Sequence, residues 1–326
     1  MTEKGGILVT GGAGYIGSHV VLELLERGEE VVVLDDLSAG PAVAMPDSAI
    51  FVQGNIADET VVRELIETHH IHTVFHFAAF IRVEESMQYP EKYFKNNTEN
   101  TAVLIRAAQD AGVKNFIYSS TAAVYGEPEK MPVGEDAPTK PVSPYGESKL
   151  RAEKFVAESG MQFIILHYFN VAGADPKGRT GYRFEERPSH LIRAALRAAL
   201  SGATLQVFGT DYPTPDGSCV RDYIHVSDLA KAHTEALSYL RAGGASQTFN
   251  CGNGRGYSVL EVVDSVTRVA GVELKTNHVA RRPGDPAIII ADASRVMKAF
   301  SWIPEYTELD TMIRDEFAWM RSRVQN

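Results

Sequence analysis

Short, largely apolar runs alternate with segments of helical period along the first half of the chain. The runs at 7–10 and 30–34 flank residues 16–27, whose apolar positions recur at helical spacing and stop before Gly28. Continuous apolar strands are typical of parallel sheets that helices cover on both faces. We therefore predict a doubly wound α/β fold on a parallel sheet. The same pattern predicts strands at 50–53, 72–77, 115–119 and 162–167, and helices near 58–69, 91–111 and 143–159.

The regular alternation ends near residue 170, and the second half follows a different pattern. Its stretches at 173–186 and 209–221 are irregular and rich in glycine and charge, which is typical of loops that shape a ligand site. Helices are predicted at 189–201, 227–242, 258–271 and 309–323.

We expect two units that meet near residue 170. Residues 1–170 carry the parallel sheet, and residues 171–326 form a smaller mixed α/β unit that binds a ligand, although about 223–250 return to the first unit. No linker rich in proline, glycine or serine separates the halves. We therefore expect them to pack together with a cleft between them.

The composition is that of a folded acidic protein. The 326 residues are 44% hydrophobic, and 32 lysines and arginines against 42 aspartates and glutamates leave a net charge of −10. No cluster of lysines and arginines could bind the phosphates of a nucleic-acid backbone, so we expect no nucleic-acid partner. The N-terminal apolar run is too short for a signal-peptide core, and 18 consecutive apolar residues occur nowhere. We expect a chain that is neither secreted nor membrane-spanning.

The two cysteines, Cys219 and Cys251, stand far apart and form no metal-ligand motif. We expect reduced thiols in a cytoplasmic protein, and no metal site. His69, His70 and His72 fall at a predicted helix end, where imidazoles favourably face the negative end of the helix dipole. We interpret that cluster as structural.

A glycine-rich turn follows the first predicted strand. Gly11, Gly14 and Gly17 have the spacing Gly-x-x-Gly-x-x-Gly at the start of a predicted helix. Such glycines allow a tight turn and let the backbone approach a diphosphate at the positive end of the helix. Asp35 stands at the tip of the second strand, where a carboxylate accepts hydrogen bonds from ribose hydroxyls and repels the extra phosphate of NADP. The arrangement predicts a Rossmann-type site for NAD.

Tyr145 and Lys149 lie four positions apart near the start of a predicted helix, and Thr121 ends the strand before it. Residues at this spacing share a helical face, so the ammonium can lower the pKa of the phenol and prepare it to accept a proton. Alone, such a pair usually forms a solvated face. Behind a dinucleotide fold, with a hydroxyl at the preceding strand end, it indicates a general base.

Further sequence blocks are spread over nearly the whole chain. They include His76-Phe-Ala-Ala79, Tyr168-Phe-Asn170, Asn250-Cys-Gly-Asn253 and Arg281-Arg-Pro-Gly-Asp285, besides the turn and the tyrosine-lysine pair. With these blocks the chain resembles the extended short-chain dehydrogenase/reductases. Asp211-Tyr-Pro-Thr214 and Arg221-Asp-Tyr-Ile-His-Val226 are more specific, and within that superfamily the chain resembles the UDP-glucose 4-epimerases.

The resemblance implies epimerisation at C4 of a UDP-hexose, UDP-glucose or UDP-galactose, with NAD retained in the protein. The sugar would pass through a transient 4-keto intermediate. Tyr145 is implied as the base and Thr121 as the bridge between the sugar hydroxyl and the phenol. Lys149 is implied to hold the nicotinamide ribose and to tune the phenol.

The resemblance also implies binding residues, of which two arginines can neutralise a diphosphate with forked hydrogen bonds. The cofactor positions are Gly11, Gly14, Tyr15, Ile16, Gly17, Asp35, Asn55, Ile56, Phe77, Ala78, Ala79, Asn96, Thr121, Tyr145, Lys149 and Phe169. The UDP-sugar positions are Thr121, Tyr145, Asn170, His190, Leu191, Phe208, Arg221, Arg282, Asp285 and Ile289.

Some positions depart from the family's pattern. Asn55 replaces a usual aspartate, although its amide oxygen can still accept from the adenine amino group. Ile81 stands where relatives often have lysine, with Arg82 next to it, and Thr121 stands where many have serine.

Ile289 falls where the resemblance places a residue beside the C2 substituent of the sugar. Isoleucine is smaller than the tyrosine that excludes an N-acetyl group, and larger than the cysteine or serine of relatives that accept both sugars. We expect UDP-glucose and UDP-galactose to be preferred and UDP-N-acetylglucosamine to be converted less efficiently. An epimerase whose main substrate is UDP-N-acetylglucosamine or a UDP-pentose remains an alternative.

Two other functions compete with epimerisation. A nucleotide-sugar 4,6-dehydratase or decarboxylase would share the fold, but dehydratases carry an Asp-Glu pair where this chain has Ala122 and Ala123. A non-catalytic NAD-binding regulator would be expected to lack Tyr145, Lys149 or Thr121. The resemblance further implies a homodimer formed by the helices at 91–111 and 143–159.

Overall fold

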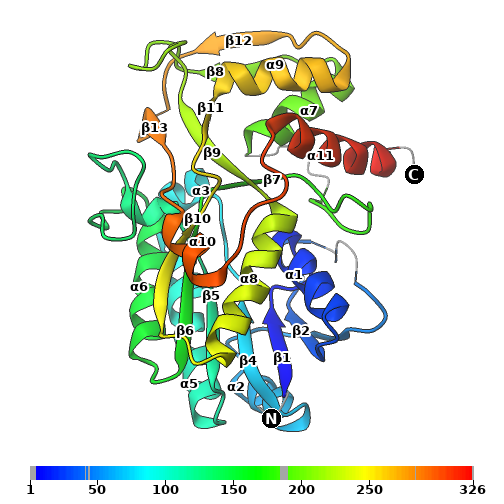
Figure 1. Cartoon of the computed structure of the whole chain (residues 1–326), viewed down its shortest axis with the longest axis vertical. Coiled ribbons are helices and arrows are strands. Elements are labelled where there is room, and N and C mark those ends of the chain that lie inside the picture. Colours follow the sequence, from blue (N-terminus) through cyan, green and yellow to red (C-terminus); the bar gives the residue numbers. More distant parts are fainter. Residues whose placement is uncertain (1–4, 41, 43–44, 184–189, 283, 325–326) are drawn as a thin grey trace.

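The main layer of the computed structural model is a seven-stranded parallel sheet with the strand order β10-β6-β5-β4-β1-β2-β3 (Figure 1). The structure describes residues 5–40, 42, 45–183, 190–282 and 284–324. This sheet confirms the predicted fold class. Its strands are β1 (Gly6–Thr10), β2 (Val31–Asp35), β3 (Ile50–Gln53), β4 (Ile71–His76), β5 (Asn115–Thr121), β6 (Gln162–Tyr168) and β10 (Gln247–Cys251).

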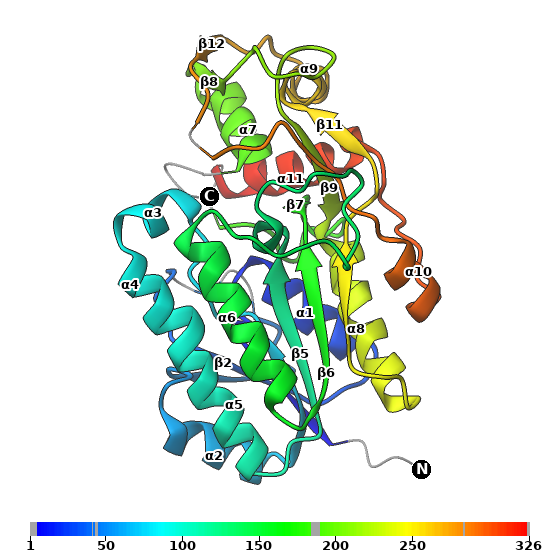
Figure 2. The ribbon, with the colours of Figure 1, turned by 90° about the vertical axis from the view of Figure 1, so that its left-hand side faces the viewer.

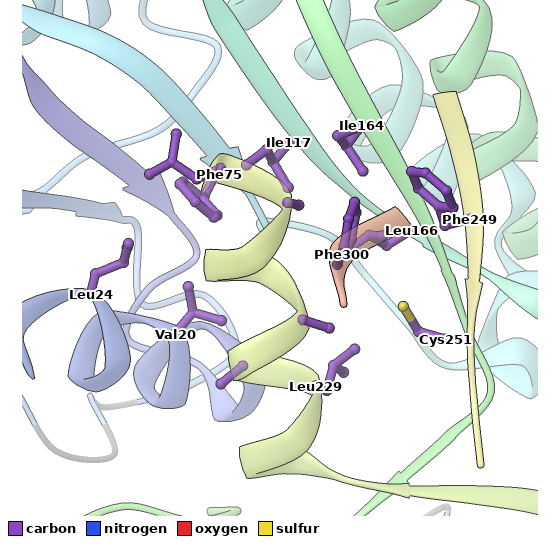
Figure 3. Close-up of a cluster of buried hydrophobic side chains, with 14 of the residues drawn as sticks. Val20, Leu24, Phe75, Ile117, Ile164, Leu166, Leu229, Phe249, Cys251 and Phe300 are labelled. Atoms are coloured by element: carbon purple, nitrogen blue, oxygen red, sulfur yellow. The ribbon is translucent and has the colours of Figure 1, made fainter. Parts of the chain in front are cut away.

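Helices cover both faces of the sheet, as continuous apolar strands require. On one face lie α1 (Tyr15–Glu26), α8 (Val226–Arg241) and α10 (Ser294–Phe300). Figure 3 shows Val20 and Leu24 of α1 and Leu229 of α8 packed towards Phe75 and Ile117 of the central strands. On the other face lie α2 (Glu59–Thr68), α5 (Asn100–Asp110) and α6 (Pro144–Glu158) (Figure 2).

The helix predicted at 91–111 is interrupted in the structure. It begins as α4 (Pro90–Tyr93), widens into a π-helical segment at Phe94–Glu99 and continues as α5. A further short helix, α3 (Val83–Gln88), precedes it and was not predicted. The π-helical segment turns two asparagines, Asn96 and Asn97, towards the loop that follows β4, which matters for the site below.

The smaller unit contains a mixed four-stranded sheet. In this sheet β7 (Asn170–Ala172) and β13 (Ile288–Ile289) pair in parallel with β9 (Val220–His225), and β11 (Gly256–Ser258) pairs antiparallel to it. A parallel pair, β8 (Leu205–Phe208) and β12 (Thr276–Val279), lies apart from it. The helices α7 (Leu191–Ser201), α9 (Val259–Ala270) and α11 (Leu309–Val324) enclose its own core. Residues 184–186 of the predicted loop and residue 189 of the predicted helix lie outside the described residues.

The chain returns to the large sheet after β9. Helix α8 packs on α1, and β10 pairs with β6 along the edge of the sheet. The strand β10 was not predicted, because its sequence, Gln-Thr-Phe-Asn-Cys, alternates polar and apolar residues with no continuous run. Its apolar residues Phe249 and Cys251 are both buried and form one edge of the core.

Several smaller expectations can be compared with the structure. Cys219 and Cys251 are free and buried, and Trp302 and Trp319 are buried in the packing. His69 caps the end of α2. Within the described ranges, no helix combines the length and the apolar composition needed to cross a membrane.

Candidate active site

A cleft of about 680 Å³ opens between the carboxyl ends of the central strands and the smaller unit. This volume falls within the roughly 300–1,000 Å³ typical of small-molecule sites. A side pocket continues from it towards the ends of β2 and β3, and both spaces share Gly11, Gly14 and Phe77 in their walls. Ligands of open α/β sheets bind at this edge.

The glycine turn between β1 and α1 forms the floor of the cleft. Gly11 has a left-handed φ of +71°, and a Cβ there would lie 2.5 Å from the backbone nitrogen of Ala78. A Cβ at Gly17 would lie 2.3 Å from the Gly11 carbonyl oxygen. Gly14 caps α1 without any side chain, so the positive end of the helix faces the cleft. The backbone packing therefore requires glycine and leaves a cradle for an anion.

Asp35 braces this turn from the tip of β2. Its carboxylate accepts hydrogen bonds from the backbone N–H groups of Ala13 (3.0 Å) and Leu37 (2.9 Å) and lines the side pocket. Burial raises the pKa of this carboxyl, and the two backbone bonds oppose that shift. The cradle and the acidic strand tip together fit an adenine dinucleotide.

The other predicted cofactor residues line the same two spaces. Asn55 departs from the simple expectation, because its amide oxygen already accepts from Ala57 N–H at 2.8 Å and its amide nitrogen donates to Asp36 at 3.0 Å. One lone pair of that oxygen remains for a ligand. Around the two spaces lie Gly11, Gly14, Tyr15, Ile16, Gly17, Asp35, Asn55, Ile56, Phe77, Ala78, Ala79, Asn96 and Phe169.

The predicted catalytic residues converge on one wall of the cleft. Thr121 ends β5, and its hydroxyl acts to lower the pKa of the Tyr145 phenol on the first turn of α6. Lys149 follows one turn later, is only 3% exposed, and holds its Nζ 4.3 Å from the centre of the Tyr118 ring. Ser143 caps α6 by accepting the Gly146 N–H, which fixes where the helix and both side chains begin.

The electrostatics of this wall differ from the sequence-based expectation in one respect. Lys149 was expected to lower the pKa of Tyr145, but burial raises that pKa, and the Thr121 hydrogen bond only partly offsets it. Burial also lowers the pKa of Lys149 to about 7, while the Glu153 carboxylate acts in the opposite direction. Enclosure disfavours both charged forms, which opposes the expected lowering of the phenol's pKa.

A buried polar network stands behind this wall. The Ser120 hydroxyl donates to the Glu153 carboxylate, and His167 Nε2 lies 3.0 Å from the same carboxylate oxygen. His167 Nδ1 lies 2.8 Å from the Tyr125 hydroxyl. These contacts fix Glu153, the acidic residue whose charge favours the ammonium form of Lys149.

Asn97, in the π-helical segment, fixes the loop opposite. Its Oδ1 accepts the Phe80 N–H, and its Nδ2 donates to the Phe80 carbonyl (both 2.9 Å) and to the Ser148 hydroxyl (3.1 Å). One side chain therefore ties the loop after β4 to the helix that carries Lys149. Ile81 and Arg82, from this loop, both line the cleft.

The smaller unit contributes the facing wall. Arg221, on β9, donates from Nη2 to the Asp285 carboxylate at 2.7 Å. Asn170 is in register with Tyr223 on the neighbouring strand, and burial lowers the pKa of His190 to about 3, so this imidazole is neutral. Of the predicted UDP-sugar positions on this side, the lining includes Asn170, His190, Arg221, Asp285 and Ile289.

Three predicted UDP-sugar residues do not contribute to the described lining. Leu191 packs against the core of the smaller unit. The Arg282 guanidinium lies 3.9 Å over the Phe208 ring and forms an ion pair with Glu84 at 3.3 Å. Arg282 and Phe208 therefore contact each other outside the cleft wall.

Other lining residues were not among the predicted site residues. Asp222 accepts backbone N–H groups of Asn253, Gly254 and Ala291, and burial raises its pKa to about 6. Arg193 and Tyr182 also lie in the wall. An arginine inside an amphipathic helix normally indicates a solvated face, so only the tertiary structure identifies this one.

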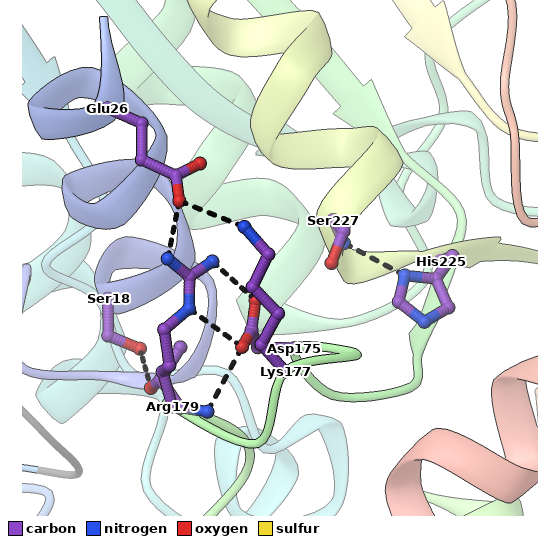
Figure 4. A network of polar contacts seen from close by, with 8 residues as sticks. Ser18, Glu26, Asp175, Lys177, Arg179, His225 and Ser227 are labelled. Carbon is purple, nitrogen blue, oxygen red and sulfur yellow. Dashed lines mark hydrogen bonds and ion pairs between the residues drawn. The ribbon is translucent and has the colours of Figure 1, made fainter.

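Residues 173–183 are anchored on the helix of the glycine turn. Figure 4 shows Arg179 between the carboxylates of Asp175 and Glu26, with bonds of 2.8 and 2.9 Å to the first and 2.5 Å to the second. Ser18 of α1 is hydrogen-bonded to Thr180 at 2.8 Å. These contacts hold the segment of the smaller unit that carries Tyr182 against α1. Within the part of the chain that the structure describes, no group of three or more His, Cys, Asp and Glu side chains could hold a metal ion.

Known proteins resemble this chain along nearly its full length. The UDP-glucose 4-epimerase of Azospirillum brasilense is 47% identical over 325 residues, 98% of this chain and 93% of that protein. The UDP-glucose-4-epimerase structure from Stenotrophomonas maltophila, with bound NAD and formylated UDP-arabinopyranose, is 40% identical with a TM-score of 0.94, over 98% of this chain and 99% of that one. The UDP-Glc/GlcNAc 4-epimerase structure from Campylobacter jejuni is 41% identical with a TM-score of 0.85, over 98% and 99%. The model of the NAD dependent epimerase/dehydratase family matches residues 7–252, and the chain belongs to that family.

Proposed function

We propose that the chain is an NAD-dependent isomerase that epimerises C4 of a UDP-hexose, interconverting UDP-glucose and UDP-galactose through a 4-keto intermediate. The observation that carries this proposal is the convergence of Thr121, Tyr145 and the buried Lys149 on one wall of the cleft. The same cleft holds the glycine cradle and the Arg221–Asp285 pair. Relatives named UDP-glucose 4-epimerase support the same reaction.

NAD would be held by the glycine turn, Asp35 and the side-pocket residues, with Lys149 on the nicotinamide ribose. When bound, NAD supplies the oxidant for C4 and afterwards the reductant that restores it. This chain contributes the handling of the proton. Tyr145 Oη, in its phenolate form, takes the proton of the sugar 4-hydroxyl, with Thr121 Oγ1 bridging the two oxygens, and returns it to O4 after the sugar has turned. Protons and electrons balance over the cycle.

The UDP moiety would stay fixed while the sugar turns. Arg221 can offer a forked pair of donors to a diphosphate, with Asp285 orienting the guanidinium. Asn170 and His190 present further polar groups in the same wall. Leu191, Phe208 and Arg282 remain proposed contacts, and they would need to approach the cleft from where they now pack.

Ile289 bears on the choice of sugar. It lines the cleft next to Arg221, with which it is in register on the neighbouring strand. Its intermediate size favours UDP-glucose and UDP-galactose, with lower activity on UDP-N-acetylglucosamine. Relatives named for UDP-arabinose or for UDP-Glc/GlcNAc support keeping a UDP-pentose or an N-acetylated sugar as alternative substrates. A dehydratase or decarboxylase is less favoured, because Ala122 and Ala123 in the wall have no proton to transfer.

We further propose that residues 1–170 bind NAD and residues 171–326 bind the UDP-sugar, with about 223–250 belonging to the first unit. The pairing of β10 with β6 and the packing of α8 on α1 support the return of that segment.

We propose a cytoplasmic homodimer that forms through the helices at 91–111 and 143–159. The exposed ring of Phe155 on α6 supports this contact. Light scattering of the purified protein tests it. A mass of one protomer, at micromolar concentration, would contradict it.

Incubating the purified protein with UDP-glucose, UDP-N-acetylglucosamine and UDP-xylose, without added NAD, tests the function. We expect UDP-galactose from the first substrate and a smaller yield from the second. Denatured protein should release nicotinamide dinucleotide. The 4-keto sugar must be reduced again before it is released, so the cofactor has to stay bound throughout the cycle. A 4-keto-6-deoxy product, or no product, would reject the epimerase proposal.

A further inference from the structure

Arg193 is a buried cation in the wall of the cleft for which the proposed reaction gives no role. It lies on α7 and is 3% exposed. Its Nε donates to the Glu316 carboxylate at 2.6 Å, and the other oxygen of Glu316 accepts the Gly173 N–H at 3.1 Å. Its Nη2 is buried and has no hydrogen-bond partner among the described residues. A buried donor of a charged group left without a partner is costly, which points to a ligand.

The guanidinium packs against two tyrosine rings that meet each other edge to face. Its central carbon lies 3.6 Å from the centre of the Tyr182 ring and 4.4 Å from that of Tyr15. The hydroxyl of Tyr15 donates to the Gly173 carbonyl at 2.6 Å, and the segment that carries Tyr182 is anchored on α1 by Arg179. The ion pair and the contacts with the two rings together restrict the orientation of the guanidinium.

The surroundings favour a diphosphate as the missing acceptor. Tyr15 opens α1, whose uncapped positive end faces the cleft beside Arg193. Planar guanidinium donors match phosphate oxygens in geometry and charge. Because Arg193 lines the cleft, its unpaired terminal nitrogen lies at the wall that a ligand would face.

We propose that Arg193 donates its Nη2 hydrogens to a diphosphate bound in this cleft, and that Glu316, Tyr15 and Tyr182 hold it in place to do so. The inference rests on the proposed function, in which NAD and a UDP-sugar each bring a diphosphate. It adds a ligand-binding arginine that the family resemblance does not supply. The nearness of Tyr15 to the glycine turn favours the diphosphate of NAD, and the experiment below separates the two sources.

The test compares Arg193→Met and Arg193→Lys with the wild type. Methionine removes the donors and keeps the length of the side chain, whereas lysine keeps a charge for Glu316 but lacks the fork. The NAD released from acid-denatured protein and the dissociation constant for added NAD form one arm. The other arm is the dissociation constant for UDP in protein saturated with NAD, by titration calorimetry. Adenosine and uridine, which lack a diphosphate, serve as matched control ligands.

We expect both variants to bind one diphosphate ligand at least ~10-fold more weakly, the effect of losing a charge-assisted hydrogen bond. Adenosine and uridine should bind as they do to the wild type. Weaker NAD binding with unchanged UDP binding would assign the contact to NAD, and the reverse result would assign it to the UDP-sugar.

Folded variants that bind NAD and UDP as tightly as the wild type would overturn the proposal. So would an equal loss for uridine or adenosine, because that would indicate a general distortion of the cleft around a structural ion pair. If methionine at 193 prevents folding, the lysine variant decides. A wild-type protein that binds neither NAD nor UDP would instead reject the proposed function, so the two failures can be told apart.

Discussion

The two walls of the cleft are built by different means. On the wall of the large sheet, Thr121, Tyr145 and the glycine turn stand at strand ends and first helical turns, so the backbone fixes them. On the facing wall, side chains from distant segments hold one another, as in the Arg221–Asp285 and Arg193–Glu316 pairs. The first wall is rigid before any ligand arrives, while the second depends on ion pairs that a ligand can extend or replace. This division suits a reaction in which the residues that handle the proton stay in place while the sugar turns.

The largest effect is expected on the backbone-fixed wall. Tyr145→Phe should lower turnover by at least ~10²-fold, as is typical when a positioned general base is lost. UDP affinity should stay nearly unchanged, since the ring and its packing remain. Steady-state kinetics and UDP titration measure the two quantities. Tyr89→Phe, at a tyrosine that is 59% exposed, is the control, and near wild-type turnover of Tyr145→Phe would assign the base to another group.

The facing wall should respond in affinity and not in turnover. Arg221→Met removes the donors offered to the diphosphate, and we expect UDP to bind about 10–100-fold more weakly. The turnover number at saturating substrate should change little. Arg281→Met, at an exposed arginine paired with the exposed Asp211, is the matched control. A fall in turnover without a fall in affinity would show that this wall takes part in the chemistry.

Ile289→Tyr probes the sugar pocket in the same wall. The larger ring should abolish conversion of UDP-N-acetylglucosamine and leave conversion of UDP-glucose, which shifts the ratio of the two activities by about tenfold or more. Product analysis with each substrate measures the ratio, and Ile303→Tyr, at a residue that is 78% exposed, is the control. An unchanged ratio, or a wild type inactive on the N-acetylated sugar, would exclude Ile289 as the selective residue.

The smallest effect concerns stability. Burial lowers the pKa of Lys149 to about 7, from its ordinary value of 10.5. Between these values the unfolded chain binds a proton that the folded chain does not, so the free energy of unfolding rises with pH over this range. Below pH 7 both states are charged, and the folded protein carries the full cost of a buried ammonium.

Lys149→Met should therefore raise the melting temperature by a few degrees at pH 6, and the gain should shrink towards pH 10. Thermal unfolding of protein freed of dinucleotide measures it. Lys154→Met, an exposed lysine on the same helix, should show no such trend. A gain that does not depend on pH would mean that packing, and not charge, sets the difference.

The same contrast explains what the sequence could predict. Thr121, Tyr145, Lys149 and the glycine turn follow from short-range spacing at strand ends, and the structure brings them together in one cleft. The direction of the Tyr145 pKa shift did not follow, because burial is a property of the packed molecule. Roles assigned to individual residues remain predictions.

On the facing wall, local spacing carried less information. Arg193 and Glu316 are far apart in the chain, and each occupies an ordinary position in an amphipathic helix. Arg282 and Phe208 were predicted to hold UDP, yet they stack on each other outside the lining. The strand β10 was missed because its polar residues alternate with apolar ones, as suits a strand at the edge of the sheet.

Strand β10 is synthesised well after β6, its neighbour in the sheet. When β6 leaves the ribosome, its edge is unpaired and its apolar residues Ile164 and Leu166 lack part of their cover, until α8 and β10 have been synthesised. At typical elongation rates of about 5–20 residues per second, this exposure lasts on the order of ten seconds. An unpaired edge strand invites pairing with another chain. A nascent chain released early, between the ends of β6 and β10, should therefore aggregate even though it already contains the glycine turn, Thr121, Tyr145 and Lys149.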